Sequence, residues 1–369
     1  MPLYTKNLLV LLSSITLFFS SFYLLFPTLP LYVNHIGGTK GEVGIIVGIF
    51  TLSSVLFRPV AGKIADNSGR KLVLLMGGLI FLISPLFYAM AHTVAALLLV
   101  RIFHGLGIAA FATAAIAMIA DISPPHRRGE AFGVFGMATA LALSISPAVG
   151  TWLLDAYSFT EVFLMEAIMA GSALFFGFMV EETHEDKKVV IKSSIKGAIL
   201  PSTIILLCTV TYGSIVAFLP FFAQNISNYG FFYTFYALSS ILIRIPIGRI
   251  SDKVGRHTII IPGLIILSAS LFLLSQSQVL VLLICSGVLY GIGFNSVYPV
   301  LTALLVDRVP EEVRARGLSL FTASFDLGIT MGSFVFGLMP LIWIYPLGAA
   351  VPMGALFLFS MAEYLRQEP

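Results

Sequence analysis

The chain has 369 residues, of which 58% are hydrophobic and 11% are charged, and its formal net charge is +3. Because an average soluble domain carries about 25% charged residues, a chain this apolar needs a bilayer around it rather than water. The charge is too small to indicate a nucleic-acid partner. The two cysteines have no metal-ligand spacing and no phosphate-loop motif occurs, so we expect no cofactor, no metal site and no catalytic residues.

Apolar stretches of roughly 20 residues recur along the chain between short polar segments. They predict an all-α membrane protein with about twelve transmembrane helices. The first and seventh spans contain prolines, which membrane helices tolerate at bends. The predicted spans cover residues 8–33, 43–64, 72–91, 95–120, 131–154, 159–180, 197–224, 229–250, 258–275, 279–306, 317–338 and 341–362.

Basic residues concentrate in alternate loops, whereas the opposite loops carry essentially only Lys40. Cytoplasmic loops are enriched in Lys and Arg, so we expect a multi-pass protein of the inner (plasma) membrane with both termini in the cytoplasm. The polar segment 181–196 is the expected cytoplasmic linker between an N-terminal six-helix bundle, 1–180, and a C-terminal one, 197–369. The basic loops contain Lys63, Arg70, Lys71, Arg127, Arg128, Lys187, Lys188, Lys192, Lys196, Arg249, Lys253, Arg256, Arg308, Arg314 and Arg316.

The two halves repeat at an offset of 186 residues. Many secondary transporters consist of duplicated halves with the substrate site at the midplane between them. The repeat therefore predicts two pseudo-symmetric bundles of the same orientation around a central cavity. Arg58, Gly62, Asp66, Gly69 and Arg70 correspond to Arg244, Gly248, Asp252, Gly255 and Arg256; Gly105 and Gly107 correspond to Gly291 and Gly293; and Asp121 corresponds to Asp307.

The loop after the second span resembles a signature of the major facilitator superfamily. Residues 62–71 read GKIADNSGRK, close to the family's G-x-L-x-D-x-x-G-R-K, and residues 248–257 repeat the pattern. The resemblance covers the whole chain. It implies that both loops latch the two halves together on the cytoplasmic side, through Gly62, Asp66, Gly69, Arg70, Gly248, Asp252, Gly255 and Arg256. Asp66 can pair with Arg70 or with Arg127.

The fourth span contains Arg101 and His104 in the sequence RIFHGLG, which is similar to the family's R-x-x-Q-G-x-G element. That element is associated with proton coupling. Gly287 occupies the position of Arg101 in the second half, which indicates a role for Arg101 beyond topology. Because a neighbouring cation disfavours protonation, we expect His104 to be mostly neutral and to replace the family's Gln as a hydrogen-bonding group. The competing idea, that His104 carries the coupled proton, stays open.

The fifth span resembles the glycine-rich element of the antiporter branch. Gly133, Pro147 and Gly150 match that element, whereas Ala142, Ser146 and Thr151 replace glycines. All the replacements are small, so close helix packing is retained. The resemblance therefore favours the drug:proton antiporters of the superfamily.

Ionisable residues inside spans are costly and are site candidates by default. Asp326 shares a polar face of the eleventh span with Ser319, Thr322, Thr330 and Ser333, and we expect it to couple protons together with Arg101 and His104. On the same span Ser324, Gly328 and Gly332 form a small-residue ridge suited to helix packing. Glu166 lies in the sixth span, which the resemblance places at the periphery, and we expect it near the outer interface.

Aromatic and hydroxyl side chains line further helical faces and predict the substrate cavity. A cavity of this kind with one carboxylate favours apolar or amphipathic substrates, including cationic ones. The expected cavity residues are Tyr23, Tyr233, Tyr236, Tyr290, Thr322 and Thr330.

We therefore predict a secondary active transporter that exports small amphipathic molecules by proton antiport and alternating access. The expected partners are a small-molecule substrate, protons and the lipid bilayer, and the expected state is a monomer. One alternative is a proton-coupled importer of a sugar, organic acid or other small metabolite. A second is a non-transporting sensor or a membrane enzyme, although the short loops and the lack of a nucleophile–base set favour neither.

Overall fold

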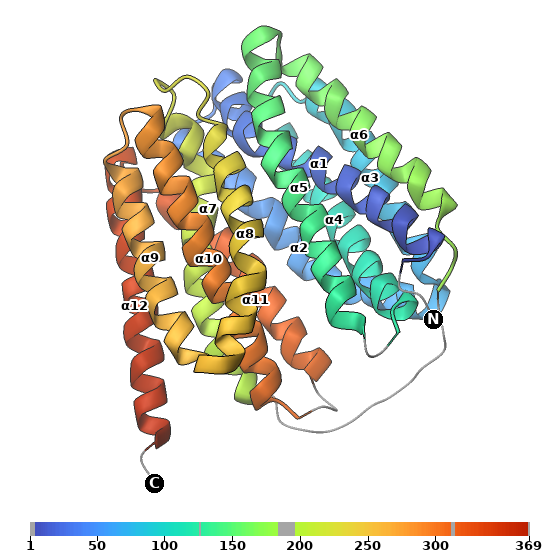
Figure 1. The fold of residues 1–369 in the computed structure, drawn as a ribbon. Helices are drawn as coiled ribbons and strands as arrows, with labels where there is room; N and C mark the ends of the chain where they lie inside the picture. Colours follow the sequence, from blue (N-terminus) through green and yellow to red (C-terminus); the bar gives the residue numbers. More distant parts are fainter. Residues whose placement is uncertain (1–3, 125–126, 184–195, 311–313, 368–369) are drawn as a thin grey trace. The chain divides into compact units, whose positions relative to one another are not determined.

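The computed structural model describes residues 4–124, 127–183, 196–310 and 314–367, and all regular elements in these ranges are helices (Figure 1). The helices are α1 (Lys6–His35), α2 (Lys40–Ser68), α3 (Arg70–Met90), α4 (Val94–Ile122), α5 (Arg128–Ala156), α6 (Phe159–Met179), the short 3₁₀ helix η2 (Lys196–Ala198), α7 (Ile199–Phe222), α8 (Phe231–Val254), α9 (His257–Ser275), α10 (Leu280–Arg308), α11 (Arg314–Gly337) and α12 (Leu341–Gln367).

Side-chain caps fix where several of these helices begin. Thr39 accepts a hydrogen bond from the backbone N–H of Glu42, and the Glu42 carboxylate accepts one from the backbone N–H of Thr39. Ser158 and Glu161 form the same reciprocal capping box at the start of α6. Such caps satisfy amide groups that the first helical turn leaves unbonded, so polar residues mark these sharp turns between apolar helices.

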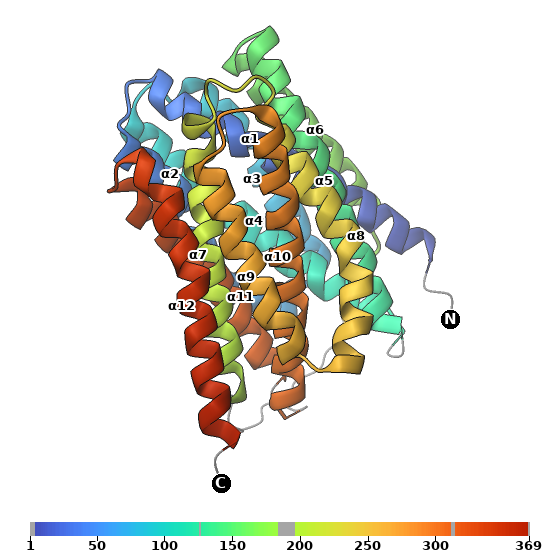
Figure 2. The same ribbon diagram turned by 60° about the vertical axis from the view of Figure 1, so that its left-hand side comes forward.

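The chain forms two compact units, residues 1–188 and 189–369. In the first unit α1 packs against α5 and α6, α4 against α2 and α3, and α3 against α6. In the second unit the same pairs recur six helices later: α7 with α11 and α12, α10 with α8 and α9, and α9 with α12. Figure 2 shows the helices of each unit running alongside one another as long rods. The repeat in the sequence is therefore a repeat of helix packing.

Glycines make the repeated packing close. A Cβ atom on Gly105 would lie 2.4 Å from the carbonyl oxygen of Phe50, and one on Gly291 would lie 2.4 Å from that of Tyr236. Phe50 and Tyr236 are themselves 186 residues apart. Only a residue without a side chain lets α4 approach α2, and α10 approach α8, at these positions.

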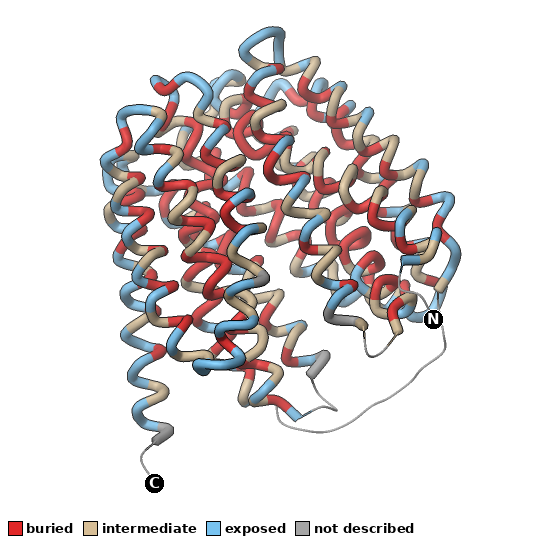
Figure 3. Tube along the Cα trace, viewed as in Figure 1, coloured by how far each residue is buried: buried red, intermediate tan, exposed pale blue. Residues whose placement is uncertain are grey.

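The outer faces of the helices are apolar. Leu56, Leu99, Leu242, Phe272 and Phe357 are each more than 60% exposed, and Figure 3 shows buried residues interleaved with exposed ones along each helix. In the described ranges eleven helices are long and apolar enough to cross a membrane, and α8 makes a twelfth if its two segments, bent by 46°, count as one span. The prediction of an all-α membrane protein with about twelve spans is confirmed.

Most of the predicted linker, 181–196, lies outside the described residues, which stop at 183 and resume at 196. Lys187, Lys188 and Lys192 of the predicted basic loops fall in that gap. Lys196 begins the short helix η2, directly before α7.

Candidate transport site

A buried polar cluster lies inside the first unit, where α3, α4 and α6 meet. Arg101 and His104 of α4 are 5% and 0% exposed. The Arg101 guanidinium donates to the hydroxyl oxygen of Tyr88 on α3 at 3.3 Å, and this hydroxyl lies 2.8 Å from Nδ1 of His104. The two predicted residues thus meet at a third, Tyr88, which the sequence did not single out.

Two further contacts hold the Arg101 side chain within the cluster. Its Nε donates to the backbone carbonyl of Ile46 on α2 at 3.1 Å, and its guanidinium carbon lies 4.1 Å from the centre of the Phe50 ring. A planar, delocalised cation can satisfy a carbonyl, a hydroxyl and an aromatic face at once. Among the described residues Arg101 forms no ion pair with a carboxylate.

Glu166 belongs to the same cluster, so the expectation that it lies near the outer interface is wrong. Its side chain is 0% exposed, and its Oε1 lies 3.8 Å from Nε2 of His104. The error has a physical cause. Because α6 is apolar around its whole circumference, its sequence carries no stripe that shows which side faces inward.

The first signature loop forms a network around Arg70, at the start of α3. Arg70 donates to Asp66, at the end of α2, at 3.1 Å and to Asp121, at the end of α4, at 2.5 Å. Gly69 between these helices has a φ of +102°, which a residue with a side chain rarely adopts. Of the two candidate partners of Asp66, Arg70 is therefore the one in contact, whereas Arg127 pairs with Glu130.

The second signature loop repeats this network at the same offset. Arg256 donates to Asp252 and, at 3.1 Å, to Asp307, and Gly255 has a φ of +91°. Partial burial lowers the pKa of Arg256, but its hydrogen bonds with these two carboxylates outweigh the burial and leave the pKa raised. A Cβ atom on Gly62 would have its nearest neighbour at 3.9 Å, and one on Gly248 would have none within 4 Å, so the packing of these two does not require glycine.

Asp326 is 8% exposed near the middle of α11. On its predicted face Thr330 and Ser333 are also buried, whereas Thr322 is half-buried and Ser319 is exposed. Thr330 and Thr322 each donate to a backbone carbonyl one turn earlier in α11. The predicted packing ridge is confirmed for Gly328 and Gly332, since a Cβ on either would lie within 2.3 Å of a backbone oxygen of α7.

Aromatic residues of the second unit gather between α7, α8 and α10. The Tyr290 ring lies 5.6 Å from Tyr236 and 5.9 Å from Phe294, and its hydroxyl lies 2.9 Å from that of Thr211. Tyr212 on α7 extends the group, with ring distances of 6.1 Å to Tyr236 and 5.9 Å to Phe294. Tyr212 was missed because α7 is almost uniformly apolar and gives no face to choose.

The remaining predicted cavity residues differ in their surroundings. Tyr233 is fully buried, and its hydroxyl donates to the backbone carbonyl of Ile215 at 3.5 Å. Tyr23, in the first unit, is half-buried among Phe19, Phe22 and Phe26 of its own helix, α1. The described residues contain no group of three His, Cys, Asp or Glu side chains that could hold a metal ion.

The model of the Major Facilitator Superfamily matches residues 11–243 and 202–369 of this chain. The chain belongs to the major facilitator superfamily. Membership in this superfamily makes it a multi-pass membrane transporter of small molecules rather than an enzyme. The resemblance predicted from the signature loops is thereby confirmed.

Two relatives and one solved structure illustrate the match. An uncharacterized MFS-type transporter of Methanocaldococcus jannaschii is 28% identical over 331 residues, which cover 85% of this chain and 86% of that protein. The quinolone resistance protein NorA of Staphylococcus aureus is 30% identical over 150 residues, 41% of this chain and 39% of NorA. The peptide transporter POT, solved in complex with sulfate, has a TM-score of 0.82 at 15% identity, covering 98% of this chain and 95% of POT. The last similarity shows the fold alone.

Proposed function

We propose that this transporter exports small amphipathic molecules from the cytoplasm by proton antiport. The observation that carries the proposal is the burial of Asp326 inside a membrane-spanning helix, beside Thr330 and Ser333. A carboxyl group in a span is costly in its ionised form, so binding and releasing a proton changes its energy strongly. This is the property that an antiporter needs of a coupling residue.

One relative, NorA, supports export over import. NorA is named for resistance to quinolones, which are small aromatic molecules, and it matches this chain over 150 residues. The rings of Tyr236 and Tyr290 lie 5.6 Å apart, and in this proposal aromatic rings of this group stack on such a substrate. In this proposal the substrate cavity is lined by Tyr23, Tyr233, Tyr236, Tyr290, Thr322 and Thr330, and the signature loops act as a cytoplasmic latch.

We place the protein in the plasma membrane as a monomer with both termini in the cytoplasm. The basic residues that gather in alternate loops support this orientation under the positive-inside rule. Proton entry from the outside would then drive the substrate outward.

Inverted membrane vesicles test the proposal. An acid interior should drive uptake of a quinolone or of an amphipathic cationic dye, and collapse of the proton gradient with an ionophore should release it. Vesicles without the transporter provide the control. Uptake of a sugar or an organic acid by right-side-out vesicles, with no transport of either test compound in inverted ones, would instead identify an importer.

A further inference from the structure

Glu166 is the most completely buried acidic residue that the proposed mechanism does not use. Its side chain is 0% exposed in the first half of α6, and neither carboxyl oxygen has a hydrogen-bond partner among the described residues. The same holds for Nε2 of His104, which faces Oε1 of Glu166 at 3.8 Å. Buried polar groups are normally hydrogen-bonded, so this pair calls for a functional explanation.

A chain of hydrogen bonds from Arg101 through Tyr88 determines which ring nitrogen of His104 carries the proton. The Tyr88 hydroxyl accepts an N–H of Arg101, which leaves its own proton to be donated to Nδ1 of His104. A neutral imidazole with Nδ1 as acceptor carries its proton on Nε2. His104 therefore directs its Nε2–H toward the carboxyl group of Glu166. A small movement of the two side chains toward each other would form the hydrogen bond.

The second unit shows that this cluster is not required for the fold. At the offset of 186 residues Arg101, His104 and Glu166 correspond to Gly287, Tyr290 and Pro352. The equivalent helices α9, α10 and α12 nevertheless pack in the same pairs as α3, α4 and α6. The ionisable groups of the first unit are therefore additions to a scaffold that forms without them.

The charges of the cluster change by one unit when Glu166 binds a proton. His104 on α4 faces Glu166 directly, and the fixed cation Arg101 and Tyr88 belong to the same hydrogen-bonded cluster. The Phe50 ring and the Ile46 carbonyl of α2 contact Arg101, and α1, which also packs against α6, contributes Tyr32 beside Phe163. With Glu166 ionised, its charge offsets that of Arg101. With Glu166 protonated, Arg101 remains as an uncompensated buried cation. The two protonation states of Glu166 therefore favour different arrangements of polar groups around the cluster.

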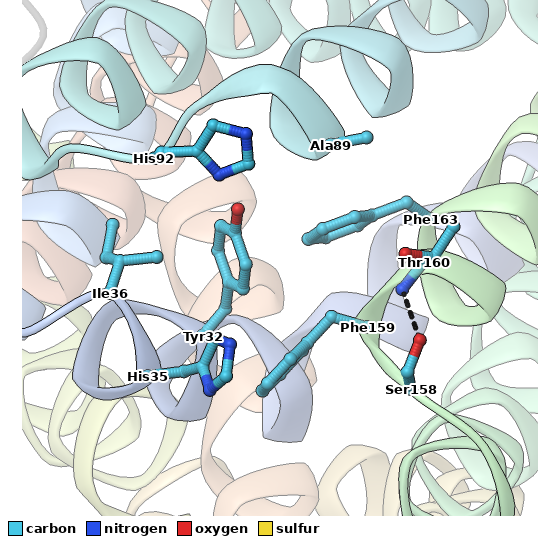
Figure 4. Close-up of a pocket in the computed structure, with 9 residues that line it drawn as sticks. All are labelled: Tyr32, His35, Ile36, Ala89, His92, Ser158, Phe159, Thr160 and Phe163. Carbon is cyan, nitrogen blue, oxygen red and sulfur yellow. Dashed lines mark hydrogen bonds between the residues drawn. The ribbon is translucent and has the colours of Figure 1, made fainter.

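A pocket of about 430 Å³ lies at one end of this cluster, between the ends of α1, α3 and α6 (Figure 4). Its wall is connected to the cluster, because the Tyr32 hydroxyl donates to the backbone carbonyl of Tyr88 at 3.2 Å and the Phe163 ring stacks on Tyr88 at 5.5 Å. Two exposed imidazoles, of His35 and His92, line the pocket beside Tyr32. Glu166 follows Phe163 by one helical turn on α6.

We propose that Glu166 is a second proton-binding site, positioned by the Arg101–Tyr88–His104 chain and reached from the pocket that His35 and His92 line. The inference rests on the proposed function, proton antiport, and extends it: among the described residues each unit carries one buried acid, Glu166 in the first and Asp326 in the second. The Glu166 carboxylate takes up a proton from the pocket side and becomes a neutral carboxylic acid. It releases this proton later in the transport cycle. His104 stays neutral throughout and acts as a positioning residue.

Infrared difference spectroscopy of the purified full-length protein tests the site directly. The Asp326→Asn variant serves as the background, because it leaves Glu166 as the buried acid under study. Between about pH 5 and 9, which brackets the ordinary pKa values of carboxyl and imidazole groups, we expect one C=O band of a protonated carboxylic acid in apolar surroundings to disappear as pH rises. Adding Glu166→Gln should remove this band.

A second variant tests positioning and does not depend on how Glu166→Gln folds. Tyr88→Phe removes the hydroxyl that orients His104, so the ionised carboxylate loses its aligned donor and the proton affinity of Glu166 should rise about tenfold. His104→Gln, which retains an amide N–H, should leave the titration midpoint unchanged. Each variant is first checked for an unchanged thermal unfolding midpoint.

Three results would overturn the site: no titrating band in the Asp326→Asn background, a band that survives Glu166→Gln, or an unshifted midpoint in Tyr88→Phe. The readout is independent of transport. A titrating Glu166 band together with absent proton-driven uptake would refute antiport while leaving the proton site standing. The reverse pattern would refute Glu166 and leave antiport intact.

Discussion

Arg70 donates a hydrogen bond from Nε to Asp121 at 2.5 Å and so ties the start of α3 to the end of α4, 51 residues away. The same guanidinium donates to Asp66 at the end of α2. Three helix ends thus meet at one side chain. In the equivalent set of the second unit, Arg256 with Asp252 and Asp307, one difference is that Arg256 also donates to Ser251 at 2.8 Å.

This difference predicts unequal effects of removing the two aspartates. Asp66→Ala should lower the transport rate about twofold to fivefold, the effect expected of an exposed charged pair worth up to about 1 kcal/mol. Asp252→Ala should lower it less, because Ser251 still holds Arg256. Initial rates in inverted vesicles, normalised to the amount of protein, measure both. Equal and negligible losses would show that the loops only set topology.

Asp326→Asn should abolish transport driven by a proton gradient while the protein still reaches the membrane. The amide is isosteric with the carboxylate but cannot bind and release a proton, so the coupling step is lost. Substrate binding to the purified variant should persist within about threefold, because Asn retains the polar contacts of a neutral acid. Normal gradient-driven export by this variant would disprove the assignment of Asp326.

His104→Gln should preserve transport and its pH dependence, because a Gln amide can replace neutral His as a partner of Tyr88 and Glu166. Arg101→Lys should fail, because an ammonium group cannot hold the Ile46 carbonyl and the Tyr88 hydroxyl while stacking on Phe50. The rate of proton-driven uptake by each variant, measured across about pH 5 to 9, tests both expectations. A flattened profile in His104→Gln would instead identify His104 as the proton carrier.

Gly332→Ala should lower the unfolding midpoint, because the added Cβ would lie 1.9 Å from the carbonyl oxygen of Val210 and force α11 away from α7. Overpacking of this kind typically costs about 1–3 kcal/mol. Gly354→Ala is the matched control, since no atom lies within 4 Å of its Cβ position. Thermal unfolding of both purified variants gives the comparison, and equal midpoints would contradict the close α7–α11 contact.

The sequence predicted those features that leave a periodic or repeated trace. Spans follow from apolar length, the two candidate partners of Asp66, Arg70 and Arg127, follow from the signature loop and its basic neighbours, and the Gly328–Gly332 ridge follows from small residues one turn apart. Tyr88 and Glu166 leave no such trace. Each lies within a long apolar stretch of its helix and belongs to no polar stripe, so only packing determines which neighbours it meets.

The site predictions for Asp326 and the cavity tyrosines remain predictions for a related reason. Burial places Asp326 inside the protein, but a coupling role depends on how its energy differs between transport states. That difference is a property of a cycle, and no single arrangement of helices or pattern of residues contains it.

The glycine contacts repeated at one offset also bear on how the protein arose. Gly105 against Phe50 and Gly291 against Tyr236 are the same contact in two copies, as expected if a gene for a six-helix ancestor was duplicated and fused. An ancestor that paired with its own copy carried identical chemistry in both partners. After fusion each copy could diverge alone, and the two halves now carry different ionisable groups: Glu166 has Pro352 as its counterpart in the second half, whereas Asp326 has Ala140 as its counterpart in the first.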